Sequence, residues 1–388
     1  MSLWWARKEQ LDEYQIRLIE NLPLRENHLI LGPPGSGKTN ILLRRAQFVR
    51  SQGMPNVLVV TFTRSLAEFV KTGCFDSQGR EIFPESCVTT LESWIRWLYD
   101  EHDAARPDPT GNFVADKLAL VRGALDFVKA GRIPKFDALF IDEAQDLMPE
   151  EAQLLSLWSP VLFFVGDDRQ KIYNHTRGLA AVRQIVPTPA EETLPFHYRL
   201  APELCEMADK IMIAQGGVGL AATCHYNGPK PGHIKREGPH NKIRQMQVMA
   251  GKLKGQIRAY GDFIQQGDFL AVIVARKDDR QTVLDFLEQD EALAEKSQIV
   301  RARNGEEDDP HDPSIDPDKP ICILTVQGCK GLEFRAVHWI FCEELSHHHG
   351  VEHYYTVVTR AKTSLDLYFE VFPQVLARAY TPPEDQLW

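Results

Sequence analysis

The chain has 388 residues, of which 43% are hydrophobic and 25% are charged, and its formal net charge is −10 at pH 7. This composition is typical of a globular protein of two or three domains and excludes a chain coated in basic patches, although a local basic groove for nucleic acid remains compatible with it. No apolar run approaches the ~20 residues of a membrane span. The segment Met1–Trp5 does not have the build of a signal peptide.

Cysteine usage points to a reducing compartment. The seven cysteines are scattered and include no C-x-x-C pair, which indicates neither a disulfide framework nor a zinc site. We therefore expect a cytoplasmic protein that has no membrane association.

The first predicted elements surround a glycine-rich segment. Apolar residues between 11 and 22 recur at roughly helical spacing up to Pro23, and this predicted helix carries Gln15. Leu29–Leu31 predicts a strand, and residues 40–45 predict a helix. The segment between them fits the pattern of glycine, four residues and Gly-Lys-Ser/Thr without a mismatch, and it consists of Gly32, Pro33, Pro34, Gly35, Ser36, Gly37, Lys38 and Thr39.

This strand–loop–helix context predicts a phosphate-binding loop. Its glycines permit positive φ, so successive backbone N–H groups can point at phosphate oxygens, and the helix N-terminus adds partial positive charge. Lys38 would reach the β- and γ-phosphates of ATP, and the hydroxyl of Thr39 would bind Mg²⁺. The alternative is a Gly/Pro turn that binds nothing.

Further elements of the first half predict a parallel sheet. Residues 56–62 read as a buried strand, Thr63-Arg64-Ser65 opens a helix, and residues 88–90 and 91–99 read as a strand and a helix. A helix is expected at 115–128. Buried strands are expected at 138–141 and 161–165, and polar clusters follow both of them. Ligands of such sheets bind at the carboxyl ends of the strands.

An acidic pair follows the strand at 138–141. Asp142 would hold Mg²⁺, mostly through water, and Glu143 would orient and deprotonate an attacking water. A small-molecule kinase is the rival interpretation of a phosphate-binding loop with an acidic pair, but it does not account for the patterns downstream.

The second half restarts after Pro187 and Pro189. Helices are expected at 202–214, 243–260 and 279–287, and strands at 269–274, 321–326, 337–341 and 365–369. Residues 216–238 are expected to be irregular, and 304–320 to form an acidic loop. We predict two α/β domains, 1–188 and 189–388, and the first would carry a small helical insert at about 99–134.

Several segments, in order along nearly the whole chain, resemble the superfamily 1 helicases of the UvrD/Rep type. The similar segments are Thr61-Phe62-Thr63, residues 141–146 (Ile-Asp-Glu-Ala-Gln-Asp), residues 165–170 followed by Ile172-Tyr173, His197-Tyr198-Arg199, residues 325–334, and residues 355–362. The resemblance implies two RecA-like domains with mainly parallel sheets and an ATP cleft between them. It also implies single-stranded DNA as the partner, with translocation or unwinding as the function.

The resemblance further implies a role for each matching residue. For the nucleotide, these are Gln15 and Tyr198 at the adenine, Glu333 near the ribose, Gln170 and Arg199 at the γ-phosphate, and Arg360 as an arginine finger. For nucleic acid, they are Thr61, Phe62, Thr63, the following Arg64 and Tyr173. His175 stands where the family often has a stacking aromatic, so the stacking platform is either His175 or absent. A salt bridge remains the alternative for Arg199 and Arg360, and a place in the core remains the alternative for Phe62.

This sequence also departs from the family pattern. The large inserted domains are missing, which argues against processive unwinding more than against ATP hydrolysis, and Glu92 stands where a phosphate-contacting His is common. A second hypothesis is therefore a regulatory or assembly ATPase that controls a protein partner, such as a nuclease or a repair or defence factor. His347-His348-His349 and His353 could suggest a metal site, but we favour a solvated loop, since no familiar zinc spacing is completed.

Overall fold

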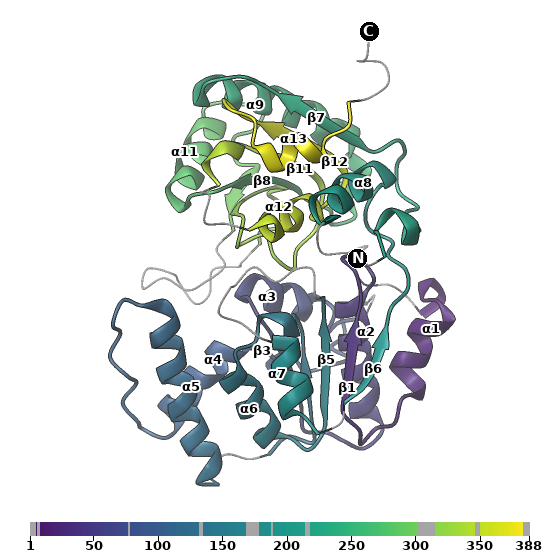
Figure 1. Cartoon of the computed structure of the whole chain (residues 1–388), viewed down its shortest axis with the longest axis vertical. Helices are drawn as coiled ribbons and strands as arrows, with labels where there is room; N and C mark the ends of the chain where they lie inside the picture. The colour runs from purple at the N-terminus through teal and green to yellow at the C-terminus, as the bar shows by residue number, and fades with distance from the viewer. Residues whose placement is uncertain are drawn as a thin grey trace. The chain divides into compact units, whose positions relative to one another are not determined.

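The computed structural model describes residues 5, 8–76, 78–131, 135–167, 178–187, 189–213, 218–300, 315–345 and 350–382. Two compact units divide the chain (Figure 1), one formed by residues 5–32 and 37–194, the other mainly by residues 195–388 together with Pro33–Ser36. In its described part, each unit contains one six-stranded sheet in which every pairing between strands is parallel. The predicted α/β fold with mainly parallel sheets is confirmed.

The sheet of the first unit has the strand order β3-β2-β4-β5-β1-β6. Its strands are β1 (His28–Leu31), β2 (Val57–Thr61), β3 (Val88–Thr90), β4 (Ala138–Ile141), β5 (Leu162–Gly166) and β6 (Ala190–Thr193). The helices are α1 (Glu13–Ile16), which continues as a π-helical turn at Arg17–Asn21, then α2 (Lys38–Ser51), α3 (Arg64–Thr72), α4 (Leu91–Glu101), α5 (Phe113–Lys129), α6 (Pro149–Trp158) and α7 (Gly178–Ile185).

Helices cover both faces of this sheet, and the strand sequences show why. Alternate strand residues face opposite sides, so Leu29, Leu139 and Phe164 join one core cluster while Ile30, Phe140 and Phe163 join the other. The first cluster includes side chains of α4, α5, α6 and α7, and the second includes those of the π-helical turn, α2 and α3. Because both faces are buried, β2, β4 and β5 read as continuous apolar runs.

The sheet of the second unit has the strand order β7-β12-β11-β8-β10-β9. Its strands are β7 (His233–Glu237), β8 (Leu270–Val274), β9 (Ser297–Ile299), β10 (Ile321–Thr325), β11 (Phe334–Trp339) and β12 (Ala361–Tyr368). The helices are α8 (Pro202–Ile211), α9 (Lys242–Ala259), α10 (Gly261–Gln265), α11 (Lys277–Glu288), α12 (Val351–Val358) and α13 (Gln374–Ala379). Residues of α9 and α11 pack on β8 and β10 in one buried cluster.

The prediction that residues 216–238 are irregular is wrong for His233–Glu237, which form the edge strand β7. This strand pairs with β12 along only one side and leaves three of its five residues exposed, so it lacks the apolar run of a central strand. The acidic loop expected at 304–320 lies largely outside the described residues. Among the described helices, none is long and apolar enough to cross a membrane.

Candidate nucleotide-binding site

The glycine-rich segment joins β1 to α2, as the sequence predicts. Gly35 and Gly37 have φ of +76° and +83°, a left-handed conformation that a side chain would strain. The backbone N–H of Gly32 donates to Gly166 at the end of β5 (3.2 Å), which anchors the start of the loop to the sheet. The ammonium of Lys38 donates to the carbonyl of Gly32 (2.8 Å), so its charge lies against the loop.

Gln15 lies beside this loop. Its backbone N–H donates to the carboxylate of Asp12 (2.7 Å), and its amide oxygen accepts from the backbone N–H of Asp12 (3.2 Å), a capping box that begins α1. A Cβ built on Gly37 would come within 3.0 Å of the amide nitrogen of Gln15. The structure therefore brings Gln15 and the loop together, as the prediction requires.

The acidic pair completes the site at the carboxyl end of β4. The Thr39 hydroxyl donates to the carboxylate of Asp142 (2.8 Å), which also accepts the backbone N–H of Glu143 (2.8 Å). Glu143 has φ of +50°, an uncommon conformation for a non-glycine residue and one often found at functional positions. Burial, and then the charge of Glu143, raise the pKa of Asp142 to about 7, partly opposed by Thr39 and Lys38.

Gln145 holds the acidic pair in place, a role that the sequence does not reveal. Its amide nitrogen donates to the carboxylate of Glu143, and its amide oxygen accepts the backbone N–H of Asp167 (3.0 Å) after β5. Gln145 is buried, so it links the ends of two strands to the orientation of Glu143.

The residues expected to meet nucleic acid lie at the end of β2 and the start of α3. Thr61 and Thr63 are buried; Thr61 donates to the carbonyl of Thr63 (3.2 Å), and the hydroxyl of Thr63 caps α3 by accepting from Leu66 (3.2 Å). Arg64 is the first residue of α3 and is partly buried. The ring of Phe62 is also partly buried, and the ammonium of Lys117 lies 5.1 Å from its centroid.

Three predicted site residues, Gln170, Tyr173 and His175, lie outside the described residues. The same holds for His347, His348 and His349. The solvated-loop interpretation is wrong for His353, which is buried in α12. The reason is that α12 buries six of its eight residues, including Tyr355 and Val357 on either side of Thr356.

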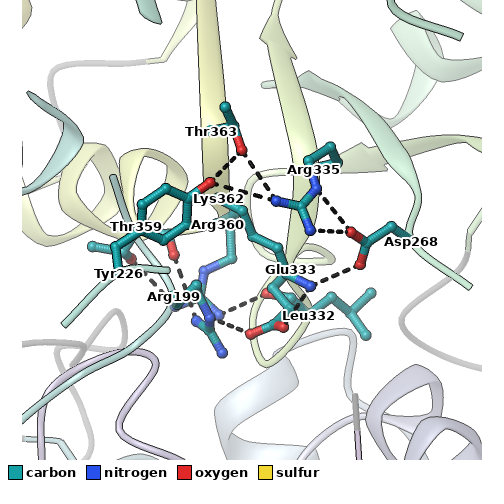
Figure 2. A network of polar contacts seen from close by, with 10 residues as sticks. All are labelled: Arg199, Tyr226, Asp268, Leu332, Glu333, Arg335, Thr359, Arg360, Lys362 and Thr363. Atoms are coloured by element: carbon teal, nitrogen blue, oxygen red, sulfur yellow. Dashed lines mark hydrogen bonds and ion pairs between the residues drawn. The ribbon is translucent and has the colours of Figure 1, made fainter. Parts of the chain in front are cut away.

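In the second unit, Arg199 pairs with Glu333 (Figure 2). The Nε of Arg199 donates to the Glu333 carboxylate, and its Nη1 lies 3.5 Å from the carbonyl of Thr359. Tyr198, just before it, is 37% exposed and makes an edge contact with His225. The structure thus joins two of the predicted nucleotide residues, and Arg199 has the salt bridge that was its alternative interpretation.

Arg360 is 1% exposed, and its guanidinium donates to three neutral oxygens. The guanidinium donates to the carbonyls of Thr356 (3.1 Å) and Leu332 (3.0 Å) and to the hydroxyl of Thr359 (3.3 Å). These contacts tie the end of α12 and the start of β12 to the segment before β11.

Three charged residues that the sequence analysis did not single out extend the Arg199–Glu333 pair into a buried network. Lys362 donates to Glu333 (2.9 Å) and to Asp268 (2.8 Å), and Asp268 accepts from Arg335 (2.8 Å), as Figure 2 shows. Burial alone would raise the pKa of Glu333, but the charges of Arg199 and Lys362 outweigh burial and lower that pKa to about 2. Glu333 is therefore a carboxylate at neutral pH.

Comparisons with known proteins bear on the first unit. The AAA domain family AAA_19 matches residues 15–176, a range that begins at Gln15 and includes the loop and the acidic pair. This match agrees with the P-loop geometry of the first unit. A search of curated proteins gives no match.

Two solved structures are similar over parts of the chain. The PRRSV helicase has 16% identity and a TM-score of 0.42, covering 89% of this chain and 53% of that one. The C-terminal domain of a possible DNA helicase from Lactobacillus plantarum WCFS1 has 16% identity and a TM-score of 0.33, covering 47% of this chain and 94% of that one. The chain thus spans about half the length of the first of them.

Proposed function

We propose that this chain is a Mg²⁺-dependent ATPase of the superfamily 1 helicase type, which couples ATP hydrolysis to translocation on single-stranded DNA. The observation that carries the proposal is the hydrogen bond between Thr39 and Asp142 beside the phosphate-binding loop. It places a hydroxyl and a carboxylate, both oxygen ligands suited to Mg²⁺, next to the ammonium of Lys38.

The residues fit a bound divalent cation. Asp142 is a buried carboxyl whose raised pKa reflects burial and a neighbouring acid, and a cation there would favour its charged form. When bound with nucleotide, Mg²⁺ would neutralise phosphate charge. Thr39 and Asp142 would hold it, and Lys38 would bind the terminal phosphates.

Glu143 is assigned as the residue that orients and deprotonates the attacking water. Its hydrogen bond from Gln145 fixes the carboxylate without supplying a positive charge that would reduce its basicity. Removing a base held in this way is expected to lower turnover much more than it lowers nucleotide affinity.

Arg199 and Arg360 are assigned the role of stabilising the negative charge that develops on the transferred phosphoryl group. Arginine fingers of this kind contribute ~10³–10⁵ in rate. To act, each would exchange its present partners for phosphate oxygens: Arg199 would leave Glu333, and Arg360 would leave the carbonyls of Thr356 and Leu332.

The carboxyl end of β2 is assigned as the contact site for nucleic acid. Phe62 offers a partly exposed ring for base stacking, and Lys117, which is paired with Glu151 (2.8 Å), lies over that ring. Thr61, Thr63 and Arg64 would contact the backbone of the strand.

The test is the initial ATPase rate of the full chain at low salt, measured without polymer and with single-stranded DNA or RNA of equal length. Glu143→Gln serves as the inactive control for contaminating ATPases. We expect a DNA-dependent rise in rate with wild type. A basal rate that neither polymer changes would reject the coupling to nucleic acid but leave the ATPase assignment standing.

A second function is favoured by one local and one global observation. Glu92 is partly exposed and paired with Arg96 (2.9 Å), and the whole chain carries a net charge of −10; both disfavour phosphate contacts. The alternative is a regulatory ATPase that controls a protein partner such as a nuclease. ATP hydrolysis without polymer stimulation would support this alternative.

A further inference from the structure

Three side chains of the second unit, none of them assigned a role above, bring metal-ligand atoms together. They are His197, Cys205 and Cys224, and their ligand atoms all lie within 4.8 Å of one another. The Sγ of Cys205 is 3.6 Å from Nε2 of His197. His197 and Cys205 are fully buried, and Cys224 is partly buried.

Backbone pairing fixes two of these residues. His197 forms a parallel bridge with Cys224, flanked by hydrogen bonds from His197 N–H to the carbonyl of Thr223 (3.1 Å) and from His225 N–H to the carbonyl of His197 (2.8 Å). The two ligand-bearing segments are therefore held side by side.

The helix that carries the third residue is tied to the same segment. Cys205 lies on α8, and Asp209, one turn later, accepts the backbone N–H groups of Leu220 (2.6 Å) and Ala221 (2.9 Å). All three ligand positions thus belong to one connected scaffold.

The polar atoms of this cluster are poorly satisfied by the protein. Both thiols point to one acceptor, the carbonyl of Leu200, at 3.3 Å from Cys224 and 3.7 Å from Cys205. Nδ1 of His197 is buried and has no hydrogen-bond partner among the residues that the structure describes, although buried ring nitrogens nearly always have one. A bound cation would give both sulfurs a charged partner in place of this shared carbonyl.

We propose that His197, Cys205 and Cys224 bind one zinc-class divalent cation. Zinc takes cysteine sulfur at ~2.3 Å and histidine nitrogen at ~2.0 Å in tetrahedral geometry, which puts sulfur and nitrogen ligands about 3.5 Å apart. The 3.6 Å between Cys205 and His197 already matches that edge. Cys224 moves toward the other two ligands on binding, and water completes the fourth position.

The protons balance. Each thiol releases one proton to solvent, because the thiolate is the metal ligand. Nε2 of His197, which now interacts with the carbonyl of Leu220 at 2.8 Å, exchanges that carbonyl for the cation; it releases its proton to solvent, and Nδ1 takes one up from solvent. The site is structural: it fixes the backbone two residues before Arg199, and it does not depend on the function proposed for that residue.

The experiment uses the full chain, purified anaerobically, stripped with chelator and titrated with Co²⁺. We expect one Co²⁺ per chain, with the visible absorption of a tetrahedral site and thiolate-to-metal charge-transfer bands, and displacement by one equivalent of Zn²⁺. Cys205→Ser and Cys224→Ser should each abolish the charge-transfer bands. Cys74→Ser, at a buried thiol of the first unit, should leave them unchanged.

A second measurement uses only the wild-type chain, so it tests the proposal even where the variants fail to fold. Zn²⁺ should slow alkylation of Cys205 and Cys224 at least tenfold, mapped by peptide mass spectrometry, and leave Cys87, a partly buried thiol elsewhere, unaffected. The proposal is overturned by absent thiolate bands, by equal alkylation with and without Zn²⁺, or by a Cys205–Cys224 disulfide in the anaerobic protein.

Discussion

The carboxylate of Asp268 accepts hydrogen bonds from two cations at once, Lys362 and Arg335, each at 2.8 Å, and it is completely buried. One negative charge in the interior of the second unit therefore faces two positive side chains, of which Lys362 also contacts Glu333 (2.9 Å). Removing it would leave both cations without their shared counter-charge, and such losses are strongly destabilising.

Asp268→Asn should lower the free energy of unfolding of the second unit by about 3–5 kcal/mol. Urea denaturation of the full chain measures this change. The matched control is Glu92→Gln, which removes an exposed i,i+4 pair with Arg96 and should cost about 0.3–0.5 kcal/mol. If both changes lowered the free energy of unfolding equally, burial would add nothing to the stabilisation from the Asp268 network.

Glu143→Gln should reduce the ATPase turnover by ~10²–10⁴, because a glutamine cannot accept the proton of the attacking water. ATP affinity, measured with a fluorescent analogue, should stay within a few-fold. Glu150→Gln is the control, since Glu150 lies in α6 of the same unit and forms a 3.9 Å ion pair with Arg122. Full activity of Glu143→Gln would remove Glu143 as the base.

Gly37→Ala should weaken nucleotide binding, since Gly37 has φ of +83° and a Cβ there would lie 3.0 Å from Gln15. Gly53→Ala is the control: its φ is +90°, but a Cβ would meet nothing within 4 Å. Both changes carry ~1–2 kcal/mol of left-handed strain. Only Gly37→Ala should change the dissociation constant for ATP, measured by calorimetry.

The pH dependence of stability should contain a contribution from Glu333. Its pKa is about 2 in the folded chain against an ordinary value of 4.5, so its stabilisation is fully present above pH 4.5 and is lost as pH falls toward 2. The difference corresponds to about 3 kcal/mol. Glu333→Gln should flatten the plot of unfolding free energy against pH in that window, whereas Glu370→Gln, at an exposed position, should not.

Phe62→Ala should weaken binding to single-stranded DNA by about 1–3 kcal/mol if bases stack on that ring. Fluorescence anisotropy with a labelled oligonucleotide measures the change. Phe75→Ala removes another exposed ring of the first unit, 37% accessible, and should leave the affinity as it is. Unchanged binding in both variants would place the strand elsewhere on the chain.

Central strands and the phosphate-binding loop were predictable because their signals are local. β2, β4, β5, β8 and β10 are buried along their whole length and almost entirely apolar, and the loop residues are contiguous in the sequence. The edge strands β6 and β7 were not predicted, since three residues of each are exposed and carry no periodic apolar signal.

The polar network and the cysteine cluster could not be predicted for a different reason. Asp268 and Arg335 are 67 residues apart, and only the pairing of β11 with β8 brings their strands together. In the same way, Cys205 and Cys224 show no zinc-like spacing, and the bridge between His197 and Cys224 creates their proximity. Contacts that depend on tertiary pairing leave no mark on the spacing of residues along a chain.

The edge strand β7 has one consequence for the behaviour of the protein in concentrated solution. An open sheet edge presents unpaired amide and carbonyl groups that a second molecule could extend, and nature commonly blocks such growth with charged side chains. β7 carries Lys235, Arg236 and Glu237 in succession, and three rings, Phe369, Phe372 and Tyr380, gather around the guanidinium of Arg236. Replacing Lys235 with valine should therefore promote strand-to-strand aggregation on storage without altering the fold of a single molecule.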